Sequence, residues 1–140
     1  RWCLIQQRRP ELQTKKELKR DMDGRIIILD VEIKSRRFCL VNVYAPNNNE
    51  PIFFDTVYNM IRNYDIPIIQ AGDYNIALQP SKDRAGESRD CHGQKRHALT
   101  SMMSAVDLFD VWRLKNPDLI RYTWRRNKLS QKEYIKNFER

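Results

Sequence analysis

The chain has 140 residues, of which 41% are hydrophobic and 31% are charged, a composition typical of a globular domain. No apolar run approaches the roughly 20 residues that a membrane-spanning helix needs, so we expect no membrane partner. The net charge of +8 favours polyanionic partners such as nucleic acid, because each Lys or Arg near a phosphate displaces a counterion. A basic surface without a particular ligand is the alternative.

The cysteines and the first residue add two further expectations. The three cysteines are far apart and form no C-x-x-C pair, which predicts free thiols in an intracellular protein rather than disulfides or a zinc site. The chain begins at Arg1 instead of a methionine. We therefore expect the natural start of the protein to lie upstream.

The first half of the chain predicts a hairpin, a helix and a buried strand. Asp23-Gly24 follows a charged stretch and is typical of a tight turn. Two β-branched runs, 25–33 and 38–44, predict adjacent antiparallel strands, the second of them central and covered on both faces. Cys39 in that strand is expected to be buried.

A helix should follow, capped by the asparagines of 46–49 and with Glu50 and Pro51 in its first turn. Apolar residues at helical spacing from Phe53 to Tyr64 predict that one face of this helix packs on the sheet. Residues 66–72 predict a short buried strand.

The second half predicts a long polar loop, a helix and two strands. The loop spans 79–93, and the helix spans 94–108 with Leu99, Met102, Met103 and Val106 on its core face. Residues 110–112 and 121–124 are expected to be short strands. The order of elements fits one α/β domain over residues 1–140, in which helices cover a mixed sheet.

Two strand ends carry side chains suited to chemistry. Asp73 and Asn75 follow the buried strand, and residues two apart on a strand share a face, so both are expected to reach one ligand. A carboxylate can accept a proton from water or hold a metal, and an amide can donate to a phosphate oxygen. An Asx-rich turn that merely closes the strand is the alternative. Tyr44, at the end of the preceding strand, can offer its hydroxyl to a phosphate or be a partly buried aromatic with a solvated tip.

The motifs N-V-Y-A-P-N (42–47) and G-D-Y-N (72–75), followed by D-V-W-R (110–113) and Y-T-W (122–124), carry a resemblance. They resemble the endonuclease domain of non-LTR retrotransposons, within the endonuclease/exonuclease/phosphatase superfamily. The resemblance implies a deoxyribonuclease-like layered sandwich of mixed β-sheets flanked by helices. It also implies an enzyme that nicks DNA by Mg²⁺-dependent phosphodiester hydrolysis, in the nucleus when part of an active element.

The same resemblance assigns catalytic roles. Tyr44 resembles the active-site tyrosine near the scissile phosphate. Asp73 resembles the aspartate that orients or deprotonates the attacking water, and Asn75 resembles its partner on the phosphate.

Four further residues are assigned supporting or DNA-binding roles. Arg84 is similar to a loop arginine that supports the site, and Thr123 matches a threonine near the DNA-contacting surface. Arg125 and Arg126 lie beside the Y-T-W motif and are favoured as contacts to the DNA backbone, where they would position the duplex without reading its sequence.

The departures from the family concern its metal-binding Glu and its terminal Asp-His pair. The Glu would lie before residue 1, and the pair has no match in 132–140. His92, in a polar loop, and His97, on a helix, are both expected to be exposed, and an isolated histidine is poor evidence for a replacement. No metal ligand is therefore identified in this chain. We predict a domain truncated at both ends that has little or no nicking activity alone. A non-catalytic basic nucleic-acid-binding remnant and a phosphatase of the same superfamily are the alternatives.

Overall fold

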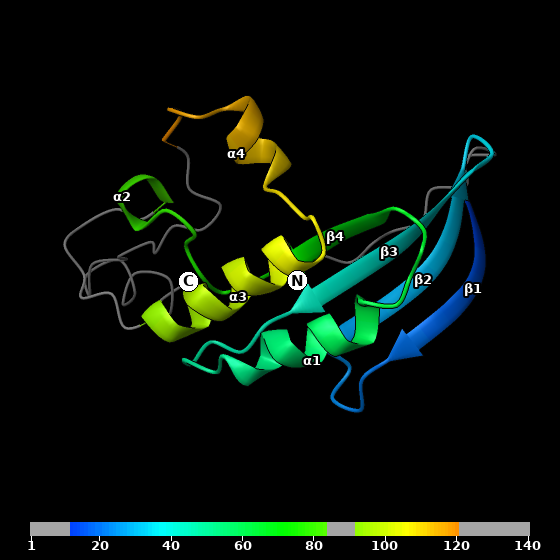
Figure 1. The fold of residues 1–140 in the computed structure, drawn as a ribbon, viewed down its shortest axis with the longest axis horizontal. Coiled ribbons are helices and arrows are strands. Elements are labelled where there is room, and N and C mark those ends of the chain that lie inside the picture. The colour runs from blue at the N-terminus through cyan, green and yellow to red at the C-terminus, as the bar shows by residue number, and fades with distance from the viewer. Residues whose placement is uncertain (1–11, 84–91, 121–140) are drawn as a thin grey trace, which may run out of the picture.

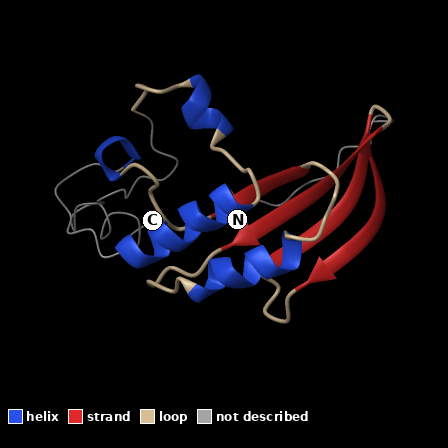
Figure 2. Ribbon diagram, viewed as in Figure 1, coloured by secondary structure: helices blue, strands red, loops and turns tan. Residues whose placement is uncertain are grey.

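The computed structural model describes residues 12–83 and 92–120, which form one mixed sheet with helices packed on it (Figures 1 and 2). The strands are β1 (Leu12–Arg20), β2 (Ile26–Ile33), β3 (Arg36–Tyr44) and β4 (Ile68–Asp73), and they lie in this order across the sheet. The pairs β1–β2 and β2–β3 are antiparallel, whereas β3–β4 is parallel. The predicted α/β class is confirmed.

The turn at Asp23-Gly24 lies where the sequence predicts it, and Gly24 has the left-handed φ of +66° that glycine adopts without strain. The charged residues before this turn form β1, a strand that the sequence analysis did not predict. Charged residues are tolerated there because β1 lies at one edge of the described sheet. Its pairing with β2 is also irregular, with register shifts between Thr14 and Lys16 and between Glu17 and Lys19.

The core lies between one face of the sheet and two helices. Ile26 pairs with Val43 and Ile28 with Val41, and these four side chains are buried on the same face. Cys39 is buried with them, as predicted. Alternate residues of β3 on the opposite face are only half-buried, so the expected coverage of both faces is incomplete in the described part of the chain.

Helix α1 (Ile52–Ile61) connects β3 to β4, as a crossover between parallel strands requires. Its apolar stripe packs on the sheet as predicted, through Phe53, Phe54, Val57 and Ile61. The predicted asparagine cap is wrong: Pro51 occupies the N-cap position, and no side chain caps the helix. Asn49 is engaged elsewhere, since its Oδ1 accepts a hydrogen bond of 3.1 Å from the backbone N–H of Lys95.

Helix α3 (Gly93–Ala105) lies beside α1 on the same face of the sheet (Figure 1). Leu99 and Met102 are buried there as predicted, and Met103 and Val106 pack against the core. The predicted loop 79–93 contains a short helix, α2 (Pro80–Asp83), and residues 84–91 lie outside the described part. Among the described helices, none is long and apolar enough to span a bilayer.

Two predicted strands differ from the structure. The strand that contains Ile69 is not buried: Ile69 is 41% exposed, because β4 has a neighbouring strand on one side only among the described residues. Residues Val111–Lys115 form a helix, α4, in place of a strand. Asp110 starts this helix by accepting a hydrogen bond of 2.9 Å from the backbone N–H of Arg113, which satisfies an otherwise unpaired donor. The strand predicted at 121–124 lies outside the described residues.

Candidate functional site at the ends of two parallel strands

The candidate site lies where β3 and β4 end together. Tyr44 and Asp73 are paired across the two parallel strands, so their Cα atoms are about 4.8 Å apart, one strand spacing. The backbone N–H of Ala45 donates to the carbonyl of Asp73 over 2.8 Å and extends the pairing by one residue. Both Tyr44, at 54% exposure, and Asp73 are open to solvent. The carboxyl ends of parallel strands are where α/β sheets usually bind ligands.

Gly72 allows the two strand ends to approach closely. Its φ is +142°, and a Cβ atom at this position would lie 1.9 Å from the carbonyl oxygen of Val43. No side chain fits at that distance. The glycine of the G-D-Y-N motif is therefore required by the backbone of β3.

Asp73 and Asn75 are joined by a turn and not by strand geometry. The strand ends at Asp73, and Asn75 has a left-handed φ of +48°, so the prediction that alternation along a strand places both on one face is wrong. The backbone N–H of Asn75 donates to Oδ1 of Asp73 over 3.0 Å, which is the Asx-type turn considered as the alternative. The turn still holds the two residues together. The carboxylate keeps acceptor positions for a further donor.

Lys95 lies beneath this turn and was missed by the sequence analysis. It is fully buried, and its Nζ donates to the carbonyl oxygens of Pro46 and Asn75, the second over 3.2 Å. Burial lowers the pKa of Lys95 from its ordinary value, while the charges of Asp73 and Glu50 oppose this change. A sequence signal existed, because Lys95 lies four residues before Leu99, on the helical stripe that is buried.

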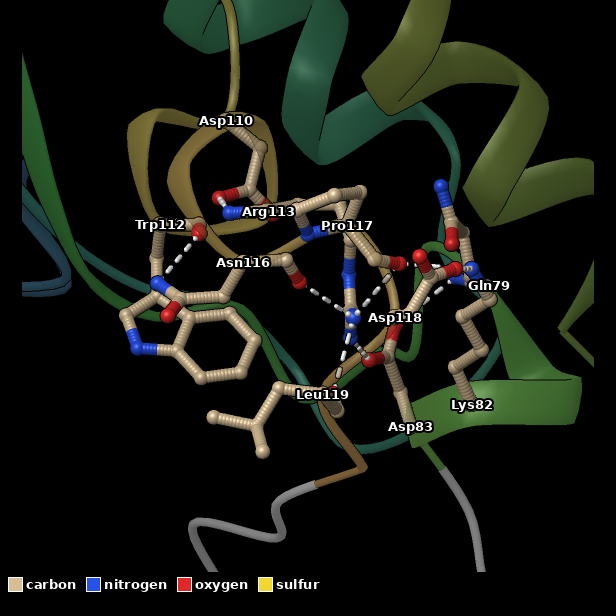
Figure 3. A network of polar contacts seen from close by, with 10 residues as sticks. All are labelled: Gln79, Lys82, Asp83, Asp110, Trp112, Arg113, Asn116, Pro117, Asp118 and Leu119. Atoms are coloured by element: carbon tan, nitrogen blue, oxygen red, sulfur yellow. Dashed lines mark hydrogen bonds and ion pairs between the residues drawn. The ribbon is translucent and has the colours of Figure 1, made fainter.

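A second polar cluster surrounds Arg113 and joins α2 to α4 (Figure 3). The guanidinium of Arg113 is 10% exposed and forms an ion pair with Asp83. It also donates to the carbonyl oxygens of Asn116 and Leu119 over 3.1 and 3.0 Å. Arg113 ends the D-V-W-R motif, and its described contacts hold the segment after α4 against α2. Its role in this structure is therefore structural.

The remaining predicted residues fall into two groups. Arg84, Thr123, Arg125 and Arg126 lie outside the described residues. A position in a polar loop favours exposure of His92, and a position on a helix surface favours exposure of His97. His97 is exposed on α3, whereas His92 lies directly before that helix and is half-buried.

The described residues contain no group of three or more His, Cys, Asp or Glu side chains that could hold a metal ion. At the strand ends, Asp73 is the carboxylate available. One or two carboxylates with substrate oxygens are typical of Mg²⁺ sites, so Asp73 could supply one protein ligand of such a site.

A comparison with curated proteins finds one informative similarity. The chain is 30% identical over 105 residues to the transposon TX1 uncharacterized 149 kDa protein of Xenopus laevis. The match covers 72% of this chain but 8% of that protein, so the chain spans a small part of the relative's length. No protein-family model matches the chain.

Proposed function

We propose that this chain is part of an endonuclease domain of a retrotransposon protein, and that the whole domain, rather than the 140-residue chain alone, nicks DNA by hydrolysing a phosphodiester bond. The observation that carries the proposal is the pairing of Tyr44 with Asp73, which joins the two motifs of the family resemblance at one sheet edge. The similarity to a protein of transposon TX1 supports the origin, and the net charge of +8 suits a DNA substrate.

The proposed fold is a single domain of the deoxyribonuclease-like kind. The described mixed sheet would be one layer of its sandwich, with α1 and α3 as the helices that cover the outer face. This arrangement would place the ends of β3 and β4 at the edge where substrate binds.

In the proposed reaction, the carboxylate of Asp73 orients a water molecule and accepts its proton as the oxygen attacks phosphorus. The hydroxyl of Tyr44 donates to a phosphate oxygen as negative charge develops there. Asn75 contributes its amide, which has two N–H groups, one of them bonded to Ala45. The bond from phosphorus to the leaving sugar oxygen breaks.

The resemblance implies that the reaction requires Mg²⁺. The described residues contain no cluster of three or more metal-ligating side chains, so no step of the reaction is assigned to this ion. We propose the requirement on the resemblance alone, and removal of divalent ions by EDTA tests it directly.

The test is nicking of supercoiled plasmid by two proteins, the 140-residue chain and the product of the whole reading frame that contains it. We expect the second to nick with Mg²⁺, and Asp73→Asn and Tyr44→Phe to lower the rate by at least 100-fold each. The control is His97→Gln, an exposed change on α3 that should leave the rate unchanged.

Two results would replace this proposal with an alternative. DNA binding without nicking by either protein would favour the non-catalytic nucleic-acid-binding remnant. Release of inorganic phosphate from a nucleotide or a phosphoinositide, with intact plasmid, would favour a phosphatase of the same superfamily.

A further inference from the structure

Lys95 connects the two strand ends from inside the protein. Its ammonium group donates to the carbonyl of Pro46, two residues after β3, and to the carbonyl of Asn75, two residues after β4. Asn75 in turn donates from its side chain to the carbonyl of Ala45 over 2.7 Å. Both loops that follow the paired residues Tyr44 and Asp73 are thus fixed to one side chain of α3.

The helix that carries Lys95 is itself fixed to the first of these loops. The side chain of Asn49 accepts from the backbone N–H of Lys95, and its amide donates to Gln94 over 3.3 Å. The position of the ammonium group relative to the loop is therefore set from both sides. Such fixed geometry is what a side chain that orients others requires.

A buried ammonium group is costly unless hydrogen bonds and opposite charges compensate it. At Lys95 the compensation comes from two carbonyl oxygens and from the nearby carboxylates of Asp73 and Glu50. A methionine would fill a similar volume without this cost. Methionine, however, could not donate hydrogen bonds to the carbonyls of the two loops. It would also bring no positive charge beneath the site.

We propose that Lys95 is a positioning residue: it holds the loops after β3 and β4 so that Tyr44 and Asp73 face the same phosphate, and it places a positive charge beneath that phosphate. This inference rests on the proposed function for the identity of the ligand. Lys95 does not touch substrate, because its side chain is fully buried. Its effect is on the turnover of bound DNA.

The first test compares Lys95→Met with Lys115→Met, a matched loss of charge at an exposed lysine of α4. In the 140-residue chain, we expect Lys95→Met to shift the backbone amide signals of Ala45, Asp73 and Asn75 in NMR spectra. The amides of β2 should stay in place, and Lys115→Met should leave both loops unchanged. Unchanged loop signals in folded Lys95→Met would overturn the inference.

The second test uses the nicking rate of the whole reading-frame product. Lys95→Met should lower kcat at least tenfold and change KM less than threefold, and Lys95→Arg should recover part of kcat because it keeps the charge. A smaller folded fraction alone would also lower the apparent kcat at constant KM, so each rate is divided by the folded fraction of that variant; a purely structural role would leave the corrected kcat unchanged. If the wild-type protein does not nick, the proposed function fails, and the amide signals still decide whether Lys95 holds the loops.

A third measurement needs no variant and applies if Lys95→Met does not fold. The Nζ protons of Lys95 should give an NMR signal in the wild-type chain that exchanges slowly with water and contacts the protons of Pro46 and Asn75. Exchange as fast as that of exposed Lys115 would contradict the inference.

Discussion

The side-chain amide of Asn75 donates to the backbone carbonyl of Ala45 over 2.7 Å, so a residue just beyond β4 holds a residue just beyond β3. Asn75 has a φ of +48°, a left-handed conformation that asparagine tolerates better than other residues with a side chain. One residue therefore shapes the turn after Asp73 and fixes that turn to the neighbouring strand.

The two contributions of Asn75 can be separated by substitution. Asn75→Gly keeps the left-handed backbone and removes the amide, and we expect it to lower the free energy of unfolding by about 1 to 2 kcal/mol. Asn75→Ala also strains the backbone and should cost about 1 kcal/mol more. Urea denaturation measures both values. Equal costs for the two variants would show that the left-handed conformation does not matter here.

Gly72 should be the least tolerant glycine of the described chain. An added Cβ would lie 1.9 Å from the carbonyl oxygen of Val43, so Gly72→Ala has to separate β3 from β4. We expect a loss of at least about 3 kcal/mol or failure to fold, from the steric clash and the unfavourable φ of +142° together.

Gly24→Ala is the matched control for this change. Gly24 also has a positive φ, of +66°, but nothing lies within 4 Å of its added Cβ. Gly24→Ala should lower the free energy of unfolding by only about 1 to 2 kcal/mol, because alanine is strained in the left-handed conformation. A similar loss for both variants in urea denaturation would show that the contact with Val43 is not what constrains Gly72.

Hydrophobic pattern predicted the elements that build the core. The runs that became β2 and β3, and the stripes of α1 and α3, follow from residues whose burial the fold depends on. β1 has no such pattern, since its charged residues pair at an edge through their backbones. The strand predicted at Val111 is a helix for a local reason. β-Branched and aromatic residues there favour a strand, but the carboxylate of Asp110 caps a helix.

The sequence predicted Tyr44 and Asp73 as parts of one site because the sheet topology brings their strand ends together. Tyr44 and Asp73 each follow an apolar strand, and the parallel pairing of β3 and β4 brings such ends together. The role of Lys95 could not be predicted from residue type, because lysine is seldom fully buried. Its contacts are with backbone carbonyls of residues far away in sequence, which leave no pattern in the side chains along the chain.

The thiol of Cys39 should make the stability of the protein depend on pH above about 9. Burial raises the pKa of Cys39 from an ordinary value of 9.0 to about 11. In the unfolded chain the thiol ionises above pH 9, whereas in the folded chain it stays protonated. Its contribution to stability is therefore complete below pH 9 and is lost as the pH rises toward 11.

The expected loss is about 2 to 3 kcal/mol, since each unit of difference in pKa corresponds to about 1.4 kcal/mol. Tyr74, whose pKa burial raises to about 12, adds a loss of the same sign above pH 10. Urea denaturation between pH 8 and pH 11 measures the slope for wild type and for Cys39→Ala. Cys39→Ala should have a lower free energy of unfolding than wild type at pH 8. Between pH 9 and pH 10 it should lose less stability than wild type does. If the stability of the two proteins fell in parallel with pH, Cys39 would not be the cause of the pH dependence.

The ion pair between Arg113 and Asp83 should be the main interaction that holds α4 to α2 (Figure 3). Arg113→Met leaves the Asp83 carboxylate, 26% exposed, without its partner, and removes donors from the carbonyls of Asn116 and Leu119. We expect a loss of about 2 to 4 kcal/mol. Lys115→Met, on the same helix but exposed, should change stability by less than about 0.5 kcal/mol.

A double-mutant cycle separates the ion pair from the other contacts of Arg113. Asp83→Asn combined with Arg113→Met should cost less than the sum of the two single changes, with a coupling of about 1 to 3 kcal/mol. The coupling should persist at 1 M salt, because Arg113 is 10% exposed and salt screens a partly buried pair weakly. Additive costs would instead assign the stability of α4 to the backbone carbonyls that Arg113 binds, with Asp83 as a minor partner.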